Sequence, residues 1–124
     1  MAPVPKKTMV CVTVQKTCER LIREGARYAA GADLSVIHVV RNGAAVLGAG
    51  SDGEALDYLY GISRTYGAQM DILRSDDVVS TLAEVARKRG IELLVMGMAN
   101  GHMPSHFETQ LRSRLPTVKI VAVP

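Results

Sequence analysis

The residues best placed to do chemistry lie between Gly97 and Glu108, in the sequence GMANGHMPSHFE. Gly97 and Gly101 follow a continuous apolar run, and Ser105 and Glu108 then stand in the spacing of a helix capping box. This order predicts a buried strand, a glycine loop and a helix. Ligands of open α/β sheets collect outside the carboxyl ends of the strands, where the N–H groups of a helix N-terminus bind anions. Whether this loop binds an anion is therefore the main functional question of the sequence.

The histidines of the chain could also ligate a metal ion. His102 and His106 are four residues apart, and Glu108 is close by. A metal site needs three or more ligands on rigid elements, whereas His102 falls in the glycine loop and no further His or Cys is near in sequence. We therefore favour loop and cap histidines and expect no metal. His38 lies in an apolar strand sequence and is interpreted as a hydrogen-bonded core or strand-end residue rather than a base.

Two further motifs have a structural and a chemical interpretation. The segment Gly48–Gly53 matches G-x-G-x-x-G, with Asp71 about twenty residues on, as in a dinucleotide fingerprint. That fingerprint must directly follow its strand, and Val40 ends the preceding strand too early, so a flexible connection before a capped helix is favoured. Asp76 and Asp77 resemble paired catalytic carboxylates, but their place just before a helix predicts capping.

The two cysteines, Cys11 and Cys18, do not form a redox or zinc pattern. Cys11 falls inside a predicted strand, as a small buried hydrophobe would. Cys18 would open a helix beside Lys16 and Arg20, where a thiolate gains some stability, so a reactive thiol is the alternative to the favoured structural role.

Length and composition indicate one α/β domain. The chain has 124 residues, is 48% apolar and carries a formal charge of +3. We expect a flexible N-terminal tail over residues 1–7 and a single domain over 8–124. The basic residues are spread among the acids without an aromatic platform, which speaks against nucleic-acid binding. The first apolar run is too short for a signal peptide or a membrane span, so no membrane insertion is expected and the predicted location is cytoplasmic.

Five strands and four helices must position these residues. Apolar runs predict strands at 9–14, 34–40, 69–73, 91–96 and 118–123. Helices are predicted from Cys18 to Gly31, from Ser51 to Gly67, from Asp77 to Gly90 and from about His106 to Leu115. Their inner faces are expected at Cys18, Leu21, Ile22, Ala26 and Ala29, at Ala55, Leu59, Ile62 and Tyr66, and at Val78, Leu82, Val85 and Ala86.

The joints between these elements repeat. Gly31, Gly67 and Gly90 each end a helix and are each followed by one apolar residue, one polar residue and a strand. A left-handed glycine stop that leads into a strand is typical of repeated βα units. With right-handed crossovers, these units form an open, five-stranded, mostly parallel sheet with helices on both faces and strand order 3-2-1-4-5.

The last strand has no following element to cover it. In this order it is an edge strand, and its sequence VKIVAV is too apolar to leave in water. We therefore expect it to pair with the same strand of a second copy in a twofold homodimer. The residues expected at this contact are Val118, Ile120, Val121, Ala122 and Val123.

From Thr8 to Pro124 the chain resembles the universal stress proteins. The opening VCVTVQKTCERL is similar to the first strand and loop of that family, and the closing VKIVAVP is similar to its last strand. The segment from Glu19 to Val39 is most similar to the stress-protein-like domain of potassium-sensing histidine kinases. The resemblance implies a Rossmann-like fold of the adenine nucleotide alpha-hydrolase kind, dimerisation through the last strand, and a role in stress responses or signalling.

The sequence departs from the pattern of the members that bind ATP. Those members end the first strand with an aspartate, where this chain has Gln15. They carry G-2x-G-9x-G-[ST] after the fourth strand. Here Gly97 matches the first glycine, Gly101 comes one residue late, and the loop is about four residues shorter. His106 and Phe107 stand where the family has its final glycine and hydroxyl residue, so a side chain crowds the phosphate position.

The resemblance and its departures lead to two functional hypotheses. The favoured one is a non-catalytic regulatory homodimer with a degenerate nucleotide site, no catalytic residues and no cofactor. The alternative is a stress protein that binds ATP or another adenine nucleotide, with slow hydrolysis. Under either hypothesis the candidate binding residues are Gln15, Lys16, Thr17, Val39, Gly97, Met98, Asn100, Gly101, Ser105 and His106.

Overall fold

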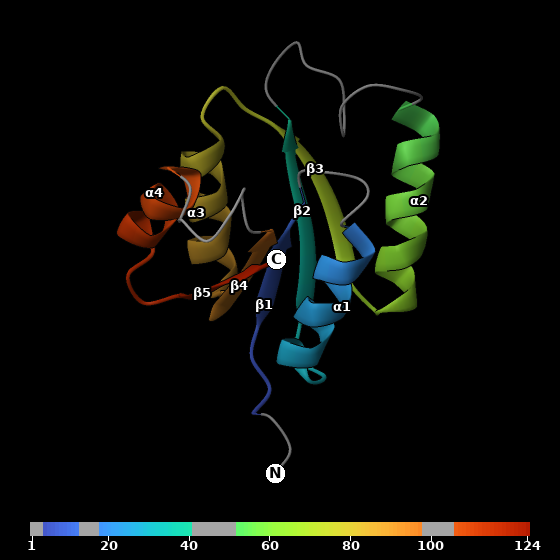
Figure 1. Ribbon diagram of the computed structural model, residues 1–124, viewed down its shortest axis with the longest axis horizontal. Coiled ribbons are helices and arrows are strands. Elements are labelled where there is room, and N and C mark those ends of the chain that lie inside the picture. Colours follow the sequence, from blue (N-terminus) through green and yellow to red (C-terminus); the bar gives the residue numbers. More distant parts are fainter. Residues whose placement is uncertain (1–3, 13–17, 41–51, 98–105) are drawn as a thin grey trace.

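The computed structural model describes residues 4–12, 18–40, 52–97 and 106–124, and for residues 52–56 it describes only the backbone. Its elements are β1 (Thr8–Cys11), α1 (Cys18–Ala29), β2 (Leu34–Val40), α2 (Asp52–Thr65), β3 (Gln69–Arg74), α3 (Val78–Arg89), β4 (Leu93–Gly97), α4 (His106–Arg114) and β5 (Lys119–Val123) (Figure 1). The predicted alternation of strands and helices is confirmed.

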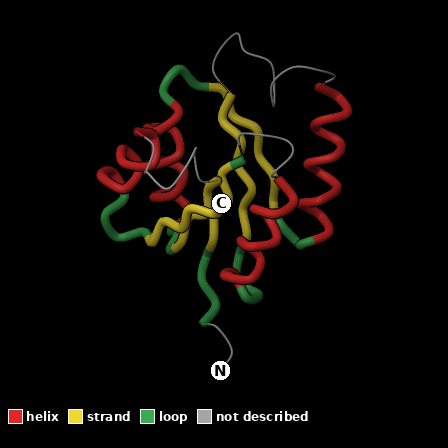
Figure 2. The backbone as a smooth tube through the Cα atoms, viewed as in Figure 1, coloured by secondary structure: helices red, strands yellow, loops and turns green. Residues whose placement is uncertain are grey.

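The strands form one sheet in the order β3-β2-β1-β4-β5. Every pairing is parallel, which confirms the predicted order and makes the described sheet parallel throughout. Helices flank the sheet on both sides (Figure 2), with α1 and α2 on one face and α3 and α4 on the other (Figure 1). Short connections and right-handed crossovers leave few other ways to cover a parallel sheet.

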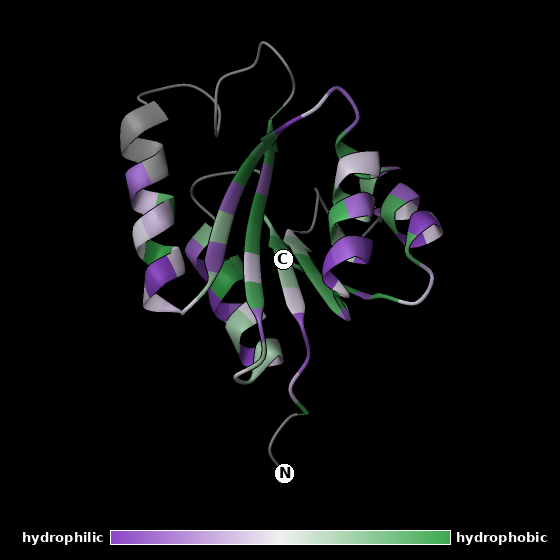
Figure 3. Cartoon of the chain, turned by 180° about the vertical axis from the view of Figure 1, so that it is seen from behind, coloured by the Kyte–Doolittle hydropathy of each residue, from purple (hydrophilic) through white to green (hydrophobic). Residues whose placement is uncertain are grey.

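The core consists of two apolar layers, one on each face of the sheet. Successive residues of a strand point to opposite faces. Val10 and Val12 therefore pack with α1 and α2, whereas Met9 and Cys11 pack with α3 and α4. The green central strands in Figure 3 reflect this double burial, since both faces of β1 and β4 are covered. None of the described helices combines the length and apolarity that a bilayer span needs.

The repeated glycine joints are confirmed. Gly31, Gly67 and Gly90 have φ values of 97°, 69° and 64°, a region that costs glycine little because it has no Cβ. At the end of α3, the N–H of Gly90 is directed at the carbonyls of Ala86 and Arg87. The end of α1 differs in one detail, because the left-handed turn already begins at Ala30, whose φ is 48°.

Several predicted boundaries and inner faces are corrected. The first strand is shorter, and residues 13 and 14 lie outside the described part, although the N–H of Val12 still bonds Ile37. The fourth strand starts two residues later and includes Gly97, which pairs with Val123. In α3, Val79 and Ala83 are buried, while the predicted Val78 and Val85 are only partly buried. The face of α3 is rotated because it also packs against α4.

The N-terminal segment joins the fold before β1 begins. The N–H of Lys6 donates to the carbonyl of Ala29, and the N–H of Lys7 donates to the Glu92 carboxylate at 2.9 Å. The carbonyl of Lys7 accepts from the N–H groups of Glu92 and Leu93. Residues 6 and 7 therefore hold together the ends of α1, β1 and β4.

Candidate functional site

The carboxyl ends of β1 and β4 lie side by side and form the topological switch point of the sheet. From β1 the chain turns to one face through α1, whereas from β4 it turns to the other face through α4. Such a divergence opens a crevice between the two strand ends, which is where open α/β sheets bind ligands. The predicted glycine loop leaves β4 at this point.

The structure describes three of the predicted binding residues. Val39 lies near the carboxyl end of β2, paired with Leu73 and partly buried on the α3 side of the sheet. Gly97 ends β4, and His106 is the exposed first residue of α4. The remaining predicted residues lie outside the described part of the chain, namely Gln15, Lys16, Thr17, Met98, Asn100, Gly101 and Ser105.

Gly97 is a glycine that the described fold does not require. A glycine at a strand exit indicates either a positive φ or the close approach of another group. Positive φ is found at Gly31, Gly67 and Gly90 but not at Gly97. A Cβ built on Gly97 would meet the Cδ1 atom of Leu21 at 3.7 Å, which is ordinary van der Waals contact. Among the described residues, therefore, neither backbone conformation nor packing explains the missing side chain.

His38 holds the end of β1 in place. Its Nδ1 lies 2.6 Å from the carbonyl oxygen of Val12, and because a carbonyl can only accept, this nitrogen carries the proton. Burial lowers the pKa of His38 below its usual range, and the bond to Val12 offsets part of that effect. The imidazole is therefore neutral at pH 7, which confirms its interpretation as a hydrogen-bonded strand residue.

Of the acidic pair before α3, Asp77 caps that helix. Asp77 has the extended backbone of an N-cap, and its Oδ1 accepts from the N–H of Ser80 at 3.0 Å. Its Oδ2 accepts from the Ser80 hydroxyl at 2.8 Å. Both oxygens thus have partners within the helix, and capping is confirmed for Asp77. A small cavity of about 210 Å³ lies beside this cap, between the first turns of α3 and α4, with His106 and Phe107 on its wall.

The carboxylate of Glu108 pairs with Arg112 in the same helix. The residue is buried, with 6% of its surface exposed, and Arg112 Nε donates to its Oε2 at 3.0 Å. Arg112 Nη2 also donates to the carbonyl of Ile120, which joins α4 to β5. The described residues contain no group of three His, Cys, Asp or Glu side chains that could hold a metal ion. His102 lies outside the described part.

Both cysteines are inert thiols. Cys11 is buried in the layer beneath α3 and α4, and burial raises its pKa to about 12. Cys18 is buried at the start of α1, and burial raises its pKa to about 11 although a backbone hydrogen bond lowers it slightly. A thiol must lose its proton to act as a nucleophile. The reactive alternative for Cys18 is therefore wrong, because the thiol is buried in the core and burial raises its pKa.

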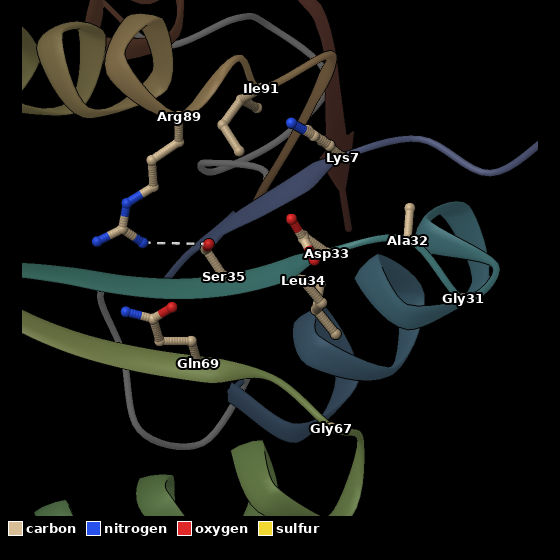
Figure 4. Close-up of a pocket in the computed structure, with 10 residues that line it drawn as sticks. All are labelled: Lys7, Gly31, Ala32, Asp33, Leu34, Ser35, Gly67, Gln69, Arg89 and Ile91. Atoms are coloured by element: carbon tan, nitrogen blue, oxygen red, sulfur yellow. Dashed lines mark hydrogen bonds between the residues drawn. The ribbon is translucent and has the colours of Figure 1, made fainter.

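The opposite, amino edge of the sheet contains a cavity of about 510 Å³ (Figure 4). Arg89 reaches across it from α3 to β2 and β3. Its Nη2 donates to Asp71 Oδ2 at 2.8 Å, and its Nη1 donates to the Ser35 hydroxyl at 3.1 Å, the bond drawn in Figure 4. Lys7 lies at the other side of the same cavity. The Arg89 contacts tether α3 to β2 and β3.

Arg89 was not singled out from the sequence. Its partners were missed because Asp71 and Ser35 are 18 and 54 residues away along the chain. The one available signal was the acidic Asp71 between two apolar residues of the predicted third strand. Such a carboxylate indicates a cation nearby but does not say which one.

Structural comparison identifies the architecture. No protein-family model and no curated protein sequence matches the chain. Among solved structures, a universal stress protein from Archaeoglobus fulgidus superposes with a TM-score of 0.71 at 17% identity, over 98% of this chain and 95% of the other. A universal stress protein in complex with cAMP gives 0.65 at 18% identity, over 98% and 100%. The Archaeoglobus fulgidus protein in complex with dAMP gives 0.61 at 18% identity, over the whole of both chains.

These similarities extend over almost every residue, so they concern the whole domain and not a shared fragment. At this level of identity they establish the architecture only, and any ligand must be argued from the residues of this chain. The strand order, the parallel pairings and the superpositions together show that this chain has the fold of the universal stress proteins.

Proposed function

We propose that the chain is a non-catalytic regulatory protein that binds an adenine nucleotide with a single phosphate at the β1–β4 switch point and acts as a homodimer. The observation that carries the proposal is Gly97, whose missing side chain the described fold does not need. A bare backbone at the carboxyl end of a central strand leaves room for a ligand to approach.

The phosphate end of the proposed site is reduced relative to an ATP site. The loop after Gly97 is shorter than in ATP-binding members of the family it resembles, and His106 and Phe107 replace their phosphate-binding pair. His106 is the first residue of α4, so one helix N-terminus remains available for an anion. The two nucleotides named in the compared structures, cAMP and dAMP, each carry one phosphate. A ligand of that size suits a shortened loop better than a triphosphate.

The absence of catalysis is proposed from the titratable groups at this edge. His38 is the described histidine nearest the end of β1, and it is buried, neutral and bonded to Val12. Cys18 stays protonated inside the core. A general base must be able to reach a water molecule with its acceptor atom and must have a pKa near the working pH. Neither side chain has these properties, so binding without hydrolysis is the simpler proposal.

The dimer is proposed from the exposed edge of β5. In the described sheet this strand pairs only with β4, so its other edge has no strand partner, although the Ile120 carbonyl accepts from Arg112. Val121 and Val123 extend the α1 side of the core, Ala122 extends the other side, and all three are only partly covered. A second copy of β5, related by a twofold axis, would pair the backbone groups of this edge and bury the side chains.

Thermal unfolding with and without nucleotide tests the ligand. AMP at a hundred times its Kd should stabilise the protein by about 2.7 kcal/mol, which corresponds to a rise in Tm of roughly 10 °C for a domain of this length. Gly97→Val should lose the response to AMP, and Gly97→Ala should keep the Tm of the free protein, because its Cβ meets Leu21 at ordinary contact distance. Gly61→Ala, on α2, is the control that keeps the response.

Four outcomes would contradict the proposal. A larger shift with ATP and magnesium than with AMP would mean that the loop still binds a triphosphate, and release of phosphate from ATP would mean that the protein is an enzyme. No shift with AMP, cAMP or ATP would exclude an adenine nucleotide altogether. An equal response in Gly97→Val would move the ligand away from the end of β4.

A further inference from the structure

A second hollow of the molecule is a groove of about 620 Å³ at the amino edge of the sheet. It lies between the last turns of α3 and α4, beside the segments that lead into β1 and β5. Ile91, Leu115 and Val118 give it an apolar floor, of which Ile91 and Leu115 are almost fully buried. The nucleotide site proposed above is at the opposite, carboxyl edge, so the two sites are independent.

Positive charge gathers on the rim of this groove. Lys6, Arg87, Arg114 and Lys119 line it, and Glu92 is the one carboxylate among the lining residues. Four cations against one anion leave a local excess of three positive charges on the rim.

None of the rim cations forms an ion pair within the described residues, although Arg87 lies near enough to Glu84 to help its partner Lys88 lower the pKa of that carboxyl. Elsewhere, Arg27, Lys88, Arg89 and Arg112 each form an ion pair at 3.0 Å or less. On the rim, Arg114 donates to the Ser80 hydroxyl, while the side chains of Lys6, Arg87 and Lys119 make no ion pair in the described structure. The oxygen Oε2 of Glu92 accepts from the backbone N–H of Lys7.

The helix dipole accounts for only part of this charge. Arg87 and Arg114 stand in the last turns of α3 and α4, where cations are favoured beside unpaired carbonyls. Lys6 and Lys119 belong to no helix, yet they face the same groove. Four cations from four separate segments therefore converge where self-repulsion alone would separate them.

The form of the groove selects the kind of anion. The ends of α3 and α4 both line the groove, and the negative partial charge of a helix C-terminus disfavours any anion deep inside it. Long Lys and Arg side chains instead meet carboxylates at the rim, while the apolar floor receives an apolar side chain. The lining contains no aromatic ring on which nucleic-acid bases could stack. A peptide that carries both acidic and apolar side chains meets all of these conditions.

We propose that this groove binds an acidic peptide segment of a partner protein, whose carboxylates pair with Lys6, Arg87, Arg114 and Lys119 and whose apolar anchor lies on Val118, beside the buried Ile91 and Leu115. Charge complementarity carries the assignment. A rim of this kind chiefly steers and orients the partner, while the apolar anchor supplies most of the affinity.

Selection from a displayed library of random decapeptides tests the proposal. The whole chain is immobilised, and the peptides it retains are sequenced. The expected result is enrichment of Asp and Glu around one or two apolar residues. One selected peptide is then labelled, and its affinity is measured by fluorescence anisotropy for the natural chain and for two variants of equal charge.

The two variants distinguish the effect of the groove on peptide affinity from the effect of the net charge of the protein. Lys6→Glu/Arg87→Glu reverses two rim residues, whereas Arg23→Glu/Arg64→Glu reverses two exposed residues of α1 and α2 on the other face of the sheet. Each substitution of Lys or Arg by Glu lowers the net charge by two, so both double variants fall from +3 to −1. The rim variant should weaken the peptide about tenfold, and the control variant by no more than about twofold. Circular dichroism verifies that both are folded.

The proposal fails if the selected peptides are not acidic, or if both variants weaken them equally. It also fails if an oligothymidylate binds more tightly than the peptide and is weakened by the rim variant, because the groove would then serve a nucleic acid. Displacement of the peptide by millimolar inorganic phosphate would identify a phosphate site and would likewise overturn it.

Discussion

Two helical glycines give opposite predictions for the same substitution. Gly25 lies in the middle of α1, where the helix approaches β1 so closely that an added Cβ would collide with Cγ2 of Val10 and press on Cδ1 of Leu34 at 3.3 Å. Gly61 lies within α2, and nothing is within 4 Å of the corresponding position. Alanine should therefore destabilise the protein at residue 25 and stabilise it at residue 61.

The magnitudes follow from two opposing terms. Replacing glycine by alanine inside a helix is favourable by about 0.5–1 kcal/mol, because the unfolded chain loses freedom. Forcing extra volume into a packed core costs about 1–3 kcal/mol. Val10 is fully buried in a strand with neighbours on both sides and cannot withdraw, so the cost at Gly25 lies near the upper end. The net loss at Gly25 is then about 2 kcal/mol, or roughly 8 °C in Tm.

Urea unfolding followed by circular dichroism measures both effects under one condition. Gly61→Ala should raise the midpoint and Gly25→Ala should lower it, with unchanged m-values. Shortening the obstructing side chain in Gly25→Ala/Val10→Ala should recover part of the loss, so that the double variant is more stable than the sum of the single changes. A Gly25→Ala protein as stable as the natural chain would refute the close contact between α1 and β1.

Three further experiments test other parts of the structure. Val121→Asp should convert the proposed dimer to a folded monomer in sedimentation velocity, because it places a charge in an apolar seam; an unchanged dimer would place the contact elsewhere. Burial lowers the pKa of His38 from 6.5, so the unfolded chain binds more protons as pH falls through that value, and the unfolding free energy should decrease from about pH 7.5 to about pH 5.5. His38→Gln should flatten this dependence, and an equal slope in the variant would assign it to other groups. Cys11 and Cys18, with pKa values of about 12 and about 11, should react with an aromatic disulfide at pH 8 only after unfolding, and rapid labelling of the native protein would contradict their burial.

Local patterns in the sequence determined the order and kind of the elements. Apolar runs gave the strands, and the β2 prediction matches its observed bounds, Leu34–Val40. The three glycine stops were recognisable because left-handed backbone favours glycine wherever it occurs. Once four βα units are recognised, the handedness of crossovers leaves few sheet orders, so the order β3-β2-β1-β4-β5 could be predicted without any knowledge of contacts.

Only the tertiary structure decided what depends on two distant segments meeting. The sequence shows Gly25 as a gap in an amphipathic helix, and the structure shows that Val10 and Leu34 fill the space. In the same way, Arg89 gains Asp71 and Ser35 as partners only when α3 lies across the sheet.

The tertiary structure also bears on why the strand before the predicted loop ends in a glycine. The sequence marked Gly97 as special but could not distinguish a backbone requirement from room for a ligand. The structure shows no backbone requirement for glycine, because Gly97 has no positive φ and has space for a Cβ among the described residues. The basic groove at the other edge was invisible in sequence, where its four cations lie in four separate segments that only the folded sheet and its helices bring together.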